Sequence, residues 1–238
     1  MKYAIIAAGE GSRLAKEGIL SPKPLVKVKG EYLIDRLIRM FTQHGATEIV
    51  AICNEQMTEV QQHLRTISQG DCPLVRFVVK SPPSSMHSMW ELSRWLHDEP
   101  FVLTTVDTIF REEEFSGYVD AFQHLVVQGD VDGLMGVTDY IDDEKPLYVE
   151  TDETLRITGF LDSCEHPRYI SGGIYGLTPK CLDTLSRCVE RGERRMRNFQ
   201  RALVRDGLHL KAYPFSKVLD IDHATDIEKA EVFLGGSG

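Results

Sequence analysis

A short apolar segment that runs directly into a glycine turn constrains the fold of this chain more than any other feature. Lys2 to Ala7 has the composition of a buried strand, and Ala8-Gly9-Glu10-Gly11-Ser12-Arg13 follows it at once. Pro22-Lys23-Pro24-Leu25 comes shortly afterwards. Small residues let backbone N–H groups approach a polyphosphate closely, because a Cβ would otherwise stand in the way. Together with the fixed charges of Arg13 and Lys23, this pattern predicts a cradle for a nucleoside triphosphate.

The glycine turn differs from the two common phosphate-binding loops. Walker A requires Gly-x-x-x-x-Gly-Lys-Ser/Thr, and Gly9 to Ser12 lacks both the spacing and the lysine. The dinucleotide-binding fingerprint requires Gly-x-Gly-x-x-Gly, whereas Leu14 occupies the place of its third glycine. A bare Gly-x-Gly also occurs in many strand-to-helix turns for steric reasons alone. The functional interpretation therefore depends on Arg13 and on the segment from Pro22 to Leu25.

Strand-like and helix-like segments alternate in the first half of the chain. The predicted strands are apolar and rich in β-branched residues: Tyr3 to Ala7, Glu48 to Cys53, Leu74 to Val79 and Phe101 to Thr105. Helical patterns lie between them, at Tyr32 to His44, Met57 to Ile67 and Met86 to His97. This alternation indicates βαβ units and a parallel sheet with helices on both faces. Ligands bind beyond the carboxyl ends of the strands of such a sheet, where Gly9 and Asp107 fall.

The pattern changes after about Gly129. Strands are predicted at residues 131–138, 147–150, 155–160, 169–177 and 209–213, helices at 179–190, 193–205 and 224–233, and turns at Asp142-Asp143-Glu144 and Asp152-Glu153. We therefore expect one α/β domain over residues 1–234. Its nucleotide-binding half would be residues 1–128 and its acceptor-binding half residues 129–234, with a linker or tail at 235–238.

Charge and composition narrow the classes of function. The net charge of −9 and the pI near 5.4 argue against general binding to nucleic acid. An acidic protein that binds triphosphate must concentrate its cations locally, and we expect it to recruit Mg²⁺. No run of 18 apolar residues occurs, so no membrane-spanning segment is predicted. The five cysteines are scattered without a Cys-x-x-Cys pair, which favours a reducing cytoplasm.

The motifs at the amino terminus resemble a known family. Ala7-Ala8-Gly9-x-Gly11-x-Arg13-Leu14, followed by Pro22-Lys23-Pro24-Leu25, is similar to the signature of the nucleotidyltransferases that make nucleotide-sugars and related activated phosphates. The similarity continues along nearly the whole chain, through residues 30–35, 45–49, Asp107, 172–175 and 222–230. It implies a sugar-phosphate nucleotidyltransferase with a Rossmann-like, doubly wound, mixed but mainly parallel sheet.

Two aspartates are candidate metal ligands. Asp107 follows the buried strand Phe101 to Val106, where an acid is placed to meet a ligand. The family carries a metal ligand at this position, usually after a glycine that Val106 replaces here, and a cap of the turn before Thr108 is the alternative. Asp222 resembles the family's second metal aspartate, although an N-cap of the last helix is an alternative. Asp220 lies two residues earlier, on the same face if the segment is extended. Mg²⁺ prefers one or two carboxylates together with substrate phosphates.

The resemblance assigns the remaining site residues. Arg13 would hold the β- and γ-phosphates and stabilise the departing pyrophosphate, and Lys23 would neutralise the α-phosphate or the acceptor phosphate. The nucleotide would contact Ala8, Gly9, Gly11, Ser12 and Ser85. Gly172 and Gly173 match the small-residue floor beneath the acceptor, with a plain turn as the alternative. Such phosphoryl-type transfer needs mainly positioning and charge stabilisation.

The acceptor side departs from the sugar-nucleotide pattern. Ser84-Ser85-Met86-His87-Ser88 stands where sugar-nucleotide enzymes often carry a Gly-Thr pair, and it is at least as similar to cytidylyltransferases that use phosphocholine or similar small phosphates. We therefore expect an NTP and a small phosphorylated acceptor, with a sugar 1-phosphate first and phosphocholine with CTP as the alternative. A glycosyltransferase using Asp220-x-Asp222, or a non-catalytic nucleotide sensor, fits Arg13 and Lys23 less well.

A cluster of arginines lies near the start of a predicted helix. Its members are Arg191, Arg194, Arg195 and Arg197. We interpret the cluster as a solvated helix face. Contact with an acceptor phosphate or with another subunit is the alternative.

Overall fold

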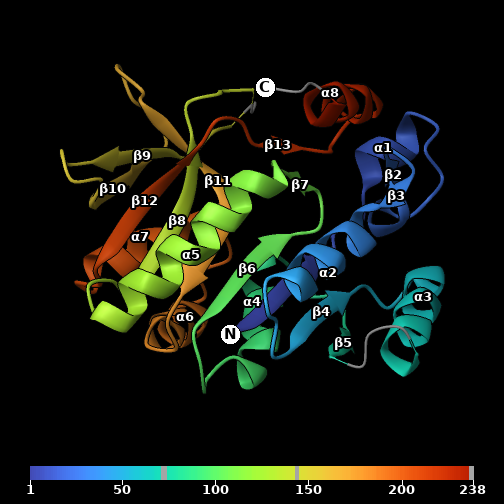
Figure 1. Cartoon of the computed structure of the whole chain (residues 1–238), viewed down its shortest axis with the longest axis horizontal. Helices are drawn as coiled ribbons and strands as arrows, with labels where there is room; N and C mark the ends of the chain where they lie inside the picture. The colour runs from blue at the N-terminus through green and yellow to red at the C-terminus, as the bar shows by residue number, and fades with distance from the viewer. Residues whose placement is uncertain (71–73, 143–144, 236–238) are drawn as a thin grey trace.

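The computed structural model describes residues 1–70, 74–142 and 145–235. Within these residues a nine-stranded mixed sheet has the order β10-β9-β11-β6-β1-β4-β5, with β8 beside β11 and β12 beside β8 (Figure 1). Its strands are β1 (Lys2–Ala7), β4 (Ile49–Cys53), β5 (Val75–Val79), β6 (Phe101–Thr105), β8 (Gly133–Thr138), β9 (Tyr148–Thr151), β10 (Ile157–Leu161), β11 (Tyr169–Leu177) and β12 (Leu210–Phe215).

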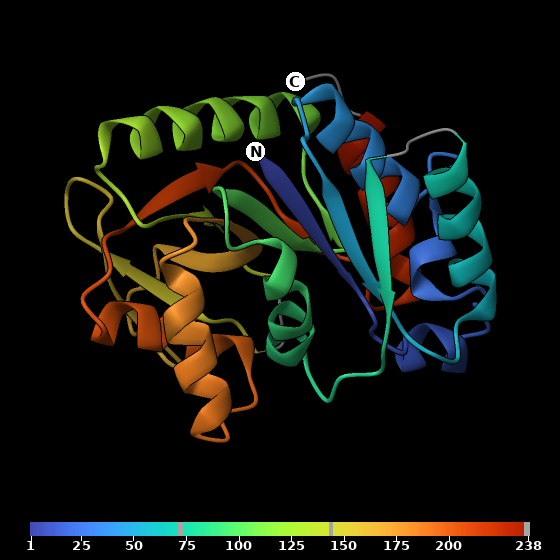
Figure 2. The ribbon, with the colours of Figure 1, turned by 90° about the horizontal axis from the view of Figure 1, so that it is seen from below.

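Helices cover both faces of this sheet, as Figure 2 shows. One layer contains α2 (Leu33–Gln43), α3 (Thr58–Gln69) and α5 (Glu112–Gln128), and the other contains α4 (Ser85–Leu92), α6 (Cys181–Glu190) and α7 (Met196–Arg205). Successive side chains of β1 point to opposite faces of the sheet, so this strand contributes to both cores. Tyr3 and Ile5 pack into the first core, and Ala4 and Ile6 pack into the second. Burial on both faces explains why β1 is apolar throughout.

The parallel strands bring their carboxyl ends to one edge of the sheet. β1 lies parallel to both β4 and β6, with Ala7 opposite Cys53 and Ile6 opposite Thr105. The segments that leave these strands therefore emerge side by side. They carry Gly9, Asn54 and Asp107, and the candidate site forms at this edge.

Strand β11 joins the first half of the chain to the second. Its residues 174–177 pair antiparallel with β6, and the same strand pairs with β8 and, near its start, with β9. The register with β8 shifts between Ser171 and Ile174. Gly173 occupies this bulge with φ +71°, a left-handed conformation that glycine adopts readily.

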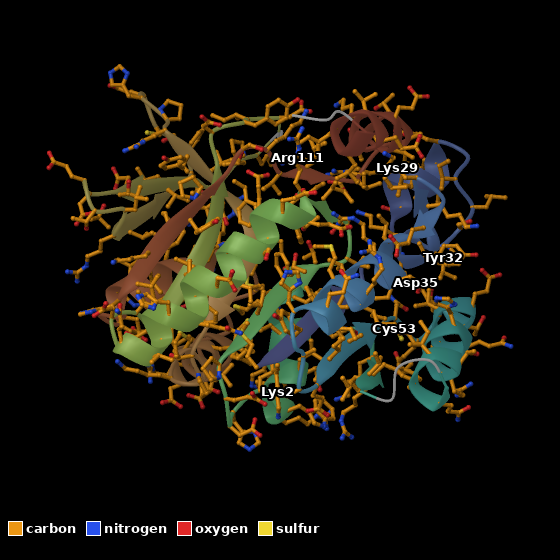
Figure 3. The ribbon with its side chains drawn as sticks, viewed as in Figure 1. Lys2, Lys29, Tyr32, Asp35, Cys53 and Arg111 are labelled. Atoms are coloured by element: carbon orange, nitrogen blue, oxygen red, sulfur yellow. The ribbon has the colours of Figure 1, made fainter. Side chains whose placement is uncertain are left out.

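The last helix, α8 (Ala224–Gly235), is anchored to both ends of the first half. The backbone N–H of Lys29 donates to Glu231 (3.0 Å), and the Lys29 ammonium donates to the carbonyl of Leu234. The Arg111 guanidinium lies 5.1 Å from the ring centre of Phe233. Figure 3 labels Lys29 and Arg111, which approach α8 from different elements. These contacts fix the direction in which the preceding segment, 219–223, crosses the sheet edge.

Short elements complete the carboxyl edge of the sheet. They are α1 (Ser12–Lys16), the 3₁₀ turn η1 (Lys23–Leu25), the hairpin of β2 (Lys27–Val28) with β3 (Glu31–Tyr32), and β7 (Thr108–Ile109) with β13 (Leu219–Asp220). A second 3₁₀ turn, η2 (Ser93–Trp95), lies at the opposite end of β1, where Lys2 donates to the carbonyl of Trp95. The β7–β13 pair places residues far apart in sequence next to one another. The Ile221 N–H donates to the carbonyl of Asp107 (3.1 Å), which brings the chain of Asp222 against that of Asp107.

Most of the expected elements are confirmed within a few residues, and so is the doubly wound mixed sheet with helices on both faces. Three predictions are corrected. No pattern predicted α5; the helix predicted over 193–205 begins only at Met196; and α8 includes Gly235, which the sequence assigned to a tail. Residues 236–238, and the Asp143 and Glu144 part of one predicted turn, lie outside the described residues. None of the described helices is long and apolar enough to cross a membrane.

Candidate active site

Lys23 is the centre of the candidate site. Its ammonium donates to Asp107 Oδ2 at 2.6 Å and to Asp222 Oδ1 at 2.8 Å. Arg13 Nη1 donates to the other oxygen of Asp222 at 2.9 Å. Lys23 is only 8% exposed, whereas Arg13 is exposed on α1. Four residues that the sequence motifs selected thus form one network of alternating charge.

The charges in this network reinforce one another. Desolvation opposes the charged form of Lys23, but Asp107 and Asp222 overcome it and raise the pKa of the ammonium. Desolvation likewise opposes ionisation of Asp222, yet the hydrogen bond and charge of Lys23, together with Arg13, lower the pKa of this carboxyl. Lys23 and Asp222 are therefore both ionised at neutral pH.

Asp220 contributes a third carboxylate to the edge. Its Oδ1 accepts a hydrogen bond from Thr108 Oγ1 (3.2 Å) across the β7–β13 pair. Desolvation, and then the charges of Asp107 and Asp222, raise the pKa of Asp220. Asp220 is nevertheless exposed, so water reaches it. Desolvation is therefore incomplete, and repulsion from the two neighbouring carboxylates is the firmer cause of the upward shift.

The carboxylate of Asp222 faces the site and does not cap α8. The N–H groups of Asp222 and His223 both donate to Asp226 Oδ2, and the N–H of Ala224 donates to Glu17 Oε2. Acids near a helix N-terminus satisfy its free N–H groups. Asp226 and Glu17 carry out this role. The carboxylate of Asp222 instead accepts hydrogen bonds from Lys23 and Arg13.

Two cavities meet at the Lys23–Asp107–Asp222 network. The first, here called the nucleotide-side cavity, has a volume of about 470 Å³ and is lined by Ile6, Ala8, Gly9, Glu10, Lys23, Asn54, residues 81–85, Ser88 and residues 105–107. The second, the acceptor-side cavity, has a volume of about 380 Å³ and is lined by Arg13, Thr138, Tyr140, Asp142, Lys145, residues 170–172, 218–220, 222–223, 225–226 and Lys229. Each is large enough for a small-molecule ligand.

Most of the residues selected from sequence line these cavities. Ala8, Gly9, Lys23, Ser85 and Asp107 line the nucleotide-side cavity, and Arg13, Gly172 and Asp222 line the acceptor-side cavity. A Cβ added at Gly9 would meet no atom within 4 Å, so packing does not require glycine there and the space is open to a ligand. Ser12 is exposed at the start of α1.

Packing and backbone conformation require glycine at positions 172 and 173. A Cβ at Gly172 would lie 3.1 Å from the carbonyl of Gly136 and 3.2 Å from Val218. Gly173 has positive φ, and its Cβ would lie 3.3 Å from Thr108 Oγ1. Close packing of β11 against β8 and β7 therefore accounts for both residues, while Gly172 also borders the acceptor-side cavity.

Gly11 packs closely against Lys23 and does not line either cavity. Its φ is +63°, and a Cβ would lie 3.3 Å from the Cβ of Lys23. We expect Gly11→Ala to cost roughly 1–2 kcal/mol of stability through backbone strain and to displace Lys23, lowering kcat. Gly45 is the matched control, since its φ is +69° with no atom near the added Cβ. Gly45→Ala is expected to lower Tm similarly but to leave kcat unchanged; equal kcat in both variants would contradict this role for Gly11.

Asn54 is a site residue that sequence reasoning missed. It follows β4, is buried, and accepts hydrogen bonds at Oδ1 from the Gln56 N–H (2.9 Å) and from Ser81 Oγ (3.0 Å). Its Nδ2 donates to the carbonyl of Ala8 at 3.3 Å. Asn54 therefore ties the glycine turn to the loop at residues 81–84 on the opposite wall. Its position after a parallel strand, at the same edge as Gly9, was the available signal.

We expect Asn54→Ala to loosen both walls of the nucleotide-side cavity. The lost hydrogen bonds should lower stability by about 1–3 kcal/mol and raise the KM for the nucleoside triphosphate more than they lower kcat. Urea unfolding and steady-state kinetics measure these two effects. Gln62→Ala, on an exposed position of α3, is the control for general loss of a side-chain amide. An unchanged KM would exclude this positioning role.

The donors at the network suit a hard divalent cation. Asp107 and Asp222 converge on one cation, the Lys23 ammonium, from elements far apart in sequence. Among the described residues, no group of three or more His, Cys, Asp or Glu side chains is arranged to hold a metal ion. Two carboxylates suffice for Mg²⁺ when substrate phosphates supply further oxygens. The donor set therefore fits the expected cofactor.

Comparisons with known proteins agree with this architecture. A family model described as nucleotidyl transferase matches residues 2–235. The glucose-1-phosphate cytidylyltransferase of Salmonella typhimurium is 36% identical over 53 residues, which are 22% of this chain and 21% of that protein. The aligned segment thus spans about a fifth of that curated relative.

Solved structures extend the likeness to the whole fold. A Bacillus anthracis structure, assigned as a glucose-1-phosphate thymidylyltransferase and containing sucrose, has a TM-score of 0.84 at 18% identity, covering 100% of this chain and 96% of that one. The CTP:phosphocholine cytidylyltransferase of Streptococcus pneumoniae has a TM-score of 0.76 at 17% identity, covering 98% of both chains.

Proposed function

Because the chain belongs to the nucleotidyl transferase family, we propose that it transfers a nucleoside monophosphate from a nucleoside triphosphate to a sugar 1-phosphate. The products are a nucleoside diphosphate sugar and pyrophosphate. The observation that carries this proposal is the position of Lys23, held between Asp107 and Asp222 where the nucleotide-side and acceptor-side cavities meet. A donor and an acceptor in these cavities would meet at that network.

The transfer is a substitution at the α-phosphorus of the triphosphate. An oxygen of the acceptor phosphate forms the new P–O bond, and the bond between the α-phosphorus and the α–β bridging oxygen breaks, so that pyrophosphate leaves with both electrons of that bond. A phosphate monoester has a second pKa of about 6 and is an anion at neutral pH. The nucleophile therefore needs no general base.

Arg13 and Lys23 stabilise the negative charges of the phosphates during this transfer. Arg13, exposed on α1 and next to Asp222, binds the β- and γ-phosphates and stabilises the departing pyrophosphate. Lys23 exchanges its contact with a carboxylate for one with the α-phosphate or the acceptor phosphate. Asp107 and Asp222 would hold Mg²⁺, which when bound neutralises phosphate charge and orients the reacting oxygens.

Acceptor-dependent release of pyrophosphate tests the proposal. The protein is incubated with Mg²⁺ and each of ATP, GTP, CTP, UTP and dTTP, against sugar 1-phosphates and phosphocholine. Release of pyrophosphate with one nucleotide and one sugar 1-phosphate is expected. Binding of a nucleotide without release for any acceptor would contradict the transferase and favour a nucleotide sensor.

A second candidate is a cytidylyltransferase that uses CTP with phosphocholine or another small alcohol phosphate. It is favoured by the mixed lining of the acceptor-side cavity, where Tyr140 lies near Asp142 (Tyr140 hydroxyl to Asp142 Oδ2, 3.4 Å). An aromatic ring beside carboxylates suits a quaternary ammonium. The Lys217 ammonium already lies 4.0 Å from the Tyr140 ring centre, and Lys229 pairs with Asp142. Because these internal cations compete for that position, the sugar 1-phosphate remains the first candidate.

A further inference from the structure

A third cavity lies beside the acceptor-side cavity, at the start of α7 and the edge formed by β9 and β10. Its volume is about 470 Å³, and we call it the arginine cavity. It is lined by Lys145, Pro146, Tyr148, Asp162, Arg195, Arg197, Asn198 and Arg201. Three arginines and a lysine from two separate parts of the chain thus surround one hollow. Of the arginine cluster that sequence analysis interprets as a solvated helix face, Arg195 and Arg197 line this cavity.

The positive charge of the arginine cavity exceeds its negative charge. Among the described residues that line it, Asp162 is the sole acid, and it receives Arg197 Nη1 at 2.5 Å and Arg201 Nη2 at 2.8 Å. Hydrogen bonds from Arg201 and Arg197 lower the pKa of Asp162. One carboxylate is therefore shared between two guanidiniums. The charge of Arg195 adds to this excess.

The arginines have different tasks. Arg197 also donates through Nη2 to the carbonyl of Lys145 (3.0 Å), and Arg201 donates through Nε to the carbonyl of Phe160 (3.0 Å). Both therefore shape the wall of the cavity. Arg195 precedes the first turn of α7 and is exposed, and in the described part of the chain no acid lies within ion-pair distance of it. Its full hydrogen-bonding capacity is open to a ligand.

The arginine cavity adjoins the acceptor-side cavity. Lys145 lines both this cavity and the acceptor-side cavity. A second link runs through α7, because Ser171 Oγ, on the floor of the acceptor-side cavity, donates to the buried Gln200 Oε1 at 3.0 Å. A molecule whose phosphate lies near Arg13 and Asp222 in the acceptor-side cavity would have to extend past Lys145 to reach Arg195.

We propose that the arginine cavity binds a second anionic group, a carboxylate or a phosphate, at the far end of the acceptor. The preferred acceptor is then a phosphorylated compound with two anionic ends, a conclusion that rests on the proposed nucleotidyl transfer. Guanidinium groups bind carboxylate and phosphate through paired N–H donors, and a concave, cation-rich wall is the surface that recognises such groups. The triphosphate does not need this cavity, because its cradle lies at the glycine turn on the other side of Lys23.

Three sugar phosphates of one skeleton test the proposal: glucose 1-phosphate, glucuronic acid 1-phosphate and glucose 1,6-bisphosphate. We expect kcat/KM for at least one of the doubly anionic acceptors to exceed that for glucose 1-phosphate by roughly ten-fold or more. Arg195→Ala should remove this advantage by raising the KM for the doubly anionic acceptor, while the KM for the nucleotide and the rate with glucose 1-phosphate stay constant. Glucuronic acid 1-phosphate and the bisphosphate distinguish a carboxylate from a phosphate.

Arg194→Ala is the matched control, since Arg194 is an exposed neighbour that does not line the cavity. It should leave all three acceptors unchanged, and Arg195→Lys should retain part of the preference. Circular dichroism checks that each variant is folded. Equal kinetics of Arg195→Ala and Arg194→Ala with every acceptor would overturn the proposal.

Calorimetric titration of glucose 1,6-bisphosphate separates this inference from the proposed function. Binding that Arg195→Ala weakens about ten-fold, without pyrophosphate release from any acceptor, would support the anion site and reject the transferase. Turnover of glucose 1-phosphate with no gain for either doubly anionic acceptor would support the transferase and reject the anion site. Absence of both binding and turnover would reject both.

Discussion

Asp107→Asn is expected to lower kcat by about a thousand-fold or more while the folded structure persists. The change is nearly isosteric, but it removes one of the two negative charges that converge on Lys23 and that would hold Mg²⁺. Steady-state pyrophosphate release at saturating substrates measures the loss. The nucleotide should still bind, because the glycine turn and Arg13 are intact, and equilibrium binding of the nucleotide checks this.

Asp120→Asn provides the control for this substitution. Asp120 lies on an exposed position of α5 and lines none of the three cavities described above. Its loss of charge should leave kcat within about two-fold of the parent protein. A comparable kcat for Asp107→Asn would show that this carboxylate does not take part in the transfer and would favour a turn-forming role at the end of β6.

Lys23→Met should have two large effects. Without the buried ammonium, Asp107 loses its ion-pair partner and Asp222 keeps only the exposed Arg13, so the protein should lose about 2–4 kcal/mol of stability at neutral pH. Asp222 is 41% exposed and water screens part of its charge, which keeps the loss below the upper range for buried pairs. In addition, kcat should fall at least about a hundred-fold, because the cation proposed to neutralise the α-phosphate or the acceptor phosphate is lost while Arg13 alone remains.

The two effects respond differently to Mg²⁺. Added Mg²⁺ replaces the missing positive charge between the carboxylates, so it should raise the Tm of Lys23→Met more than that of the parent protein, without restoring kcat. Lys211→Met, on β12, is the control for loss of a lysine outside the network. Thermal unfolding with and without Mg²⁺ measures the difference. Equal Mg²⁺ shifts in the two variants would contradict cation binding by Asp107 and Asp222.

The first half of the fold could be predicted from sequence because its signals are local. Each strand from β1 to β6 in the main sheet is a short apolar run, and each of α2 and α3 has an apolar stripe of helical period. Helix α5 escaped because Glu112-Glu113-Glu114 and Gly117 interrupt its pattern. Gly117 is set by a distant contact, since a Cβ there would lie 2.7 Å from the Tyr213 hydroxyl. A constraint set by a residue so distant in the chain produces no periodic pattern in the sequence.

The same distinction between local and tertiary signals applies to the site residues. Motif residues such as Gly9, Lys23 and Asp107 could be selected because their chemistry and their place after a strand are visible locally. That Lys23 would bridge two carboxylates 84 and 199 residues away depends on how β7 pairs with β13. The arginine cavity likewise depends on how α7 packs against β10, which places Arg197 and Arg201 on Asp162. Spacing along the chain encodes neither arrangement.

The shared strand β11 determines how this protein can move during a reaction cycle. Because β11 hydrogen-bonds to β6 on one side and to β8 on the other, the two halves of the chain are parts of one continuous sheet. A hinge that opened and closed them as separate lobes would have to break that ladder. Motion that leaves this ladder intact is confined to segments outside it, which include helix α1 with Arg13. The nucleotide-side and acceptor-side cavities therefore stand on one hydrogen-bonded sheet and not on two separate lobes.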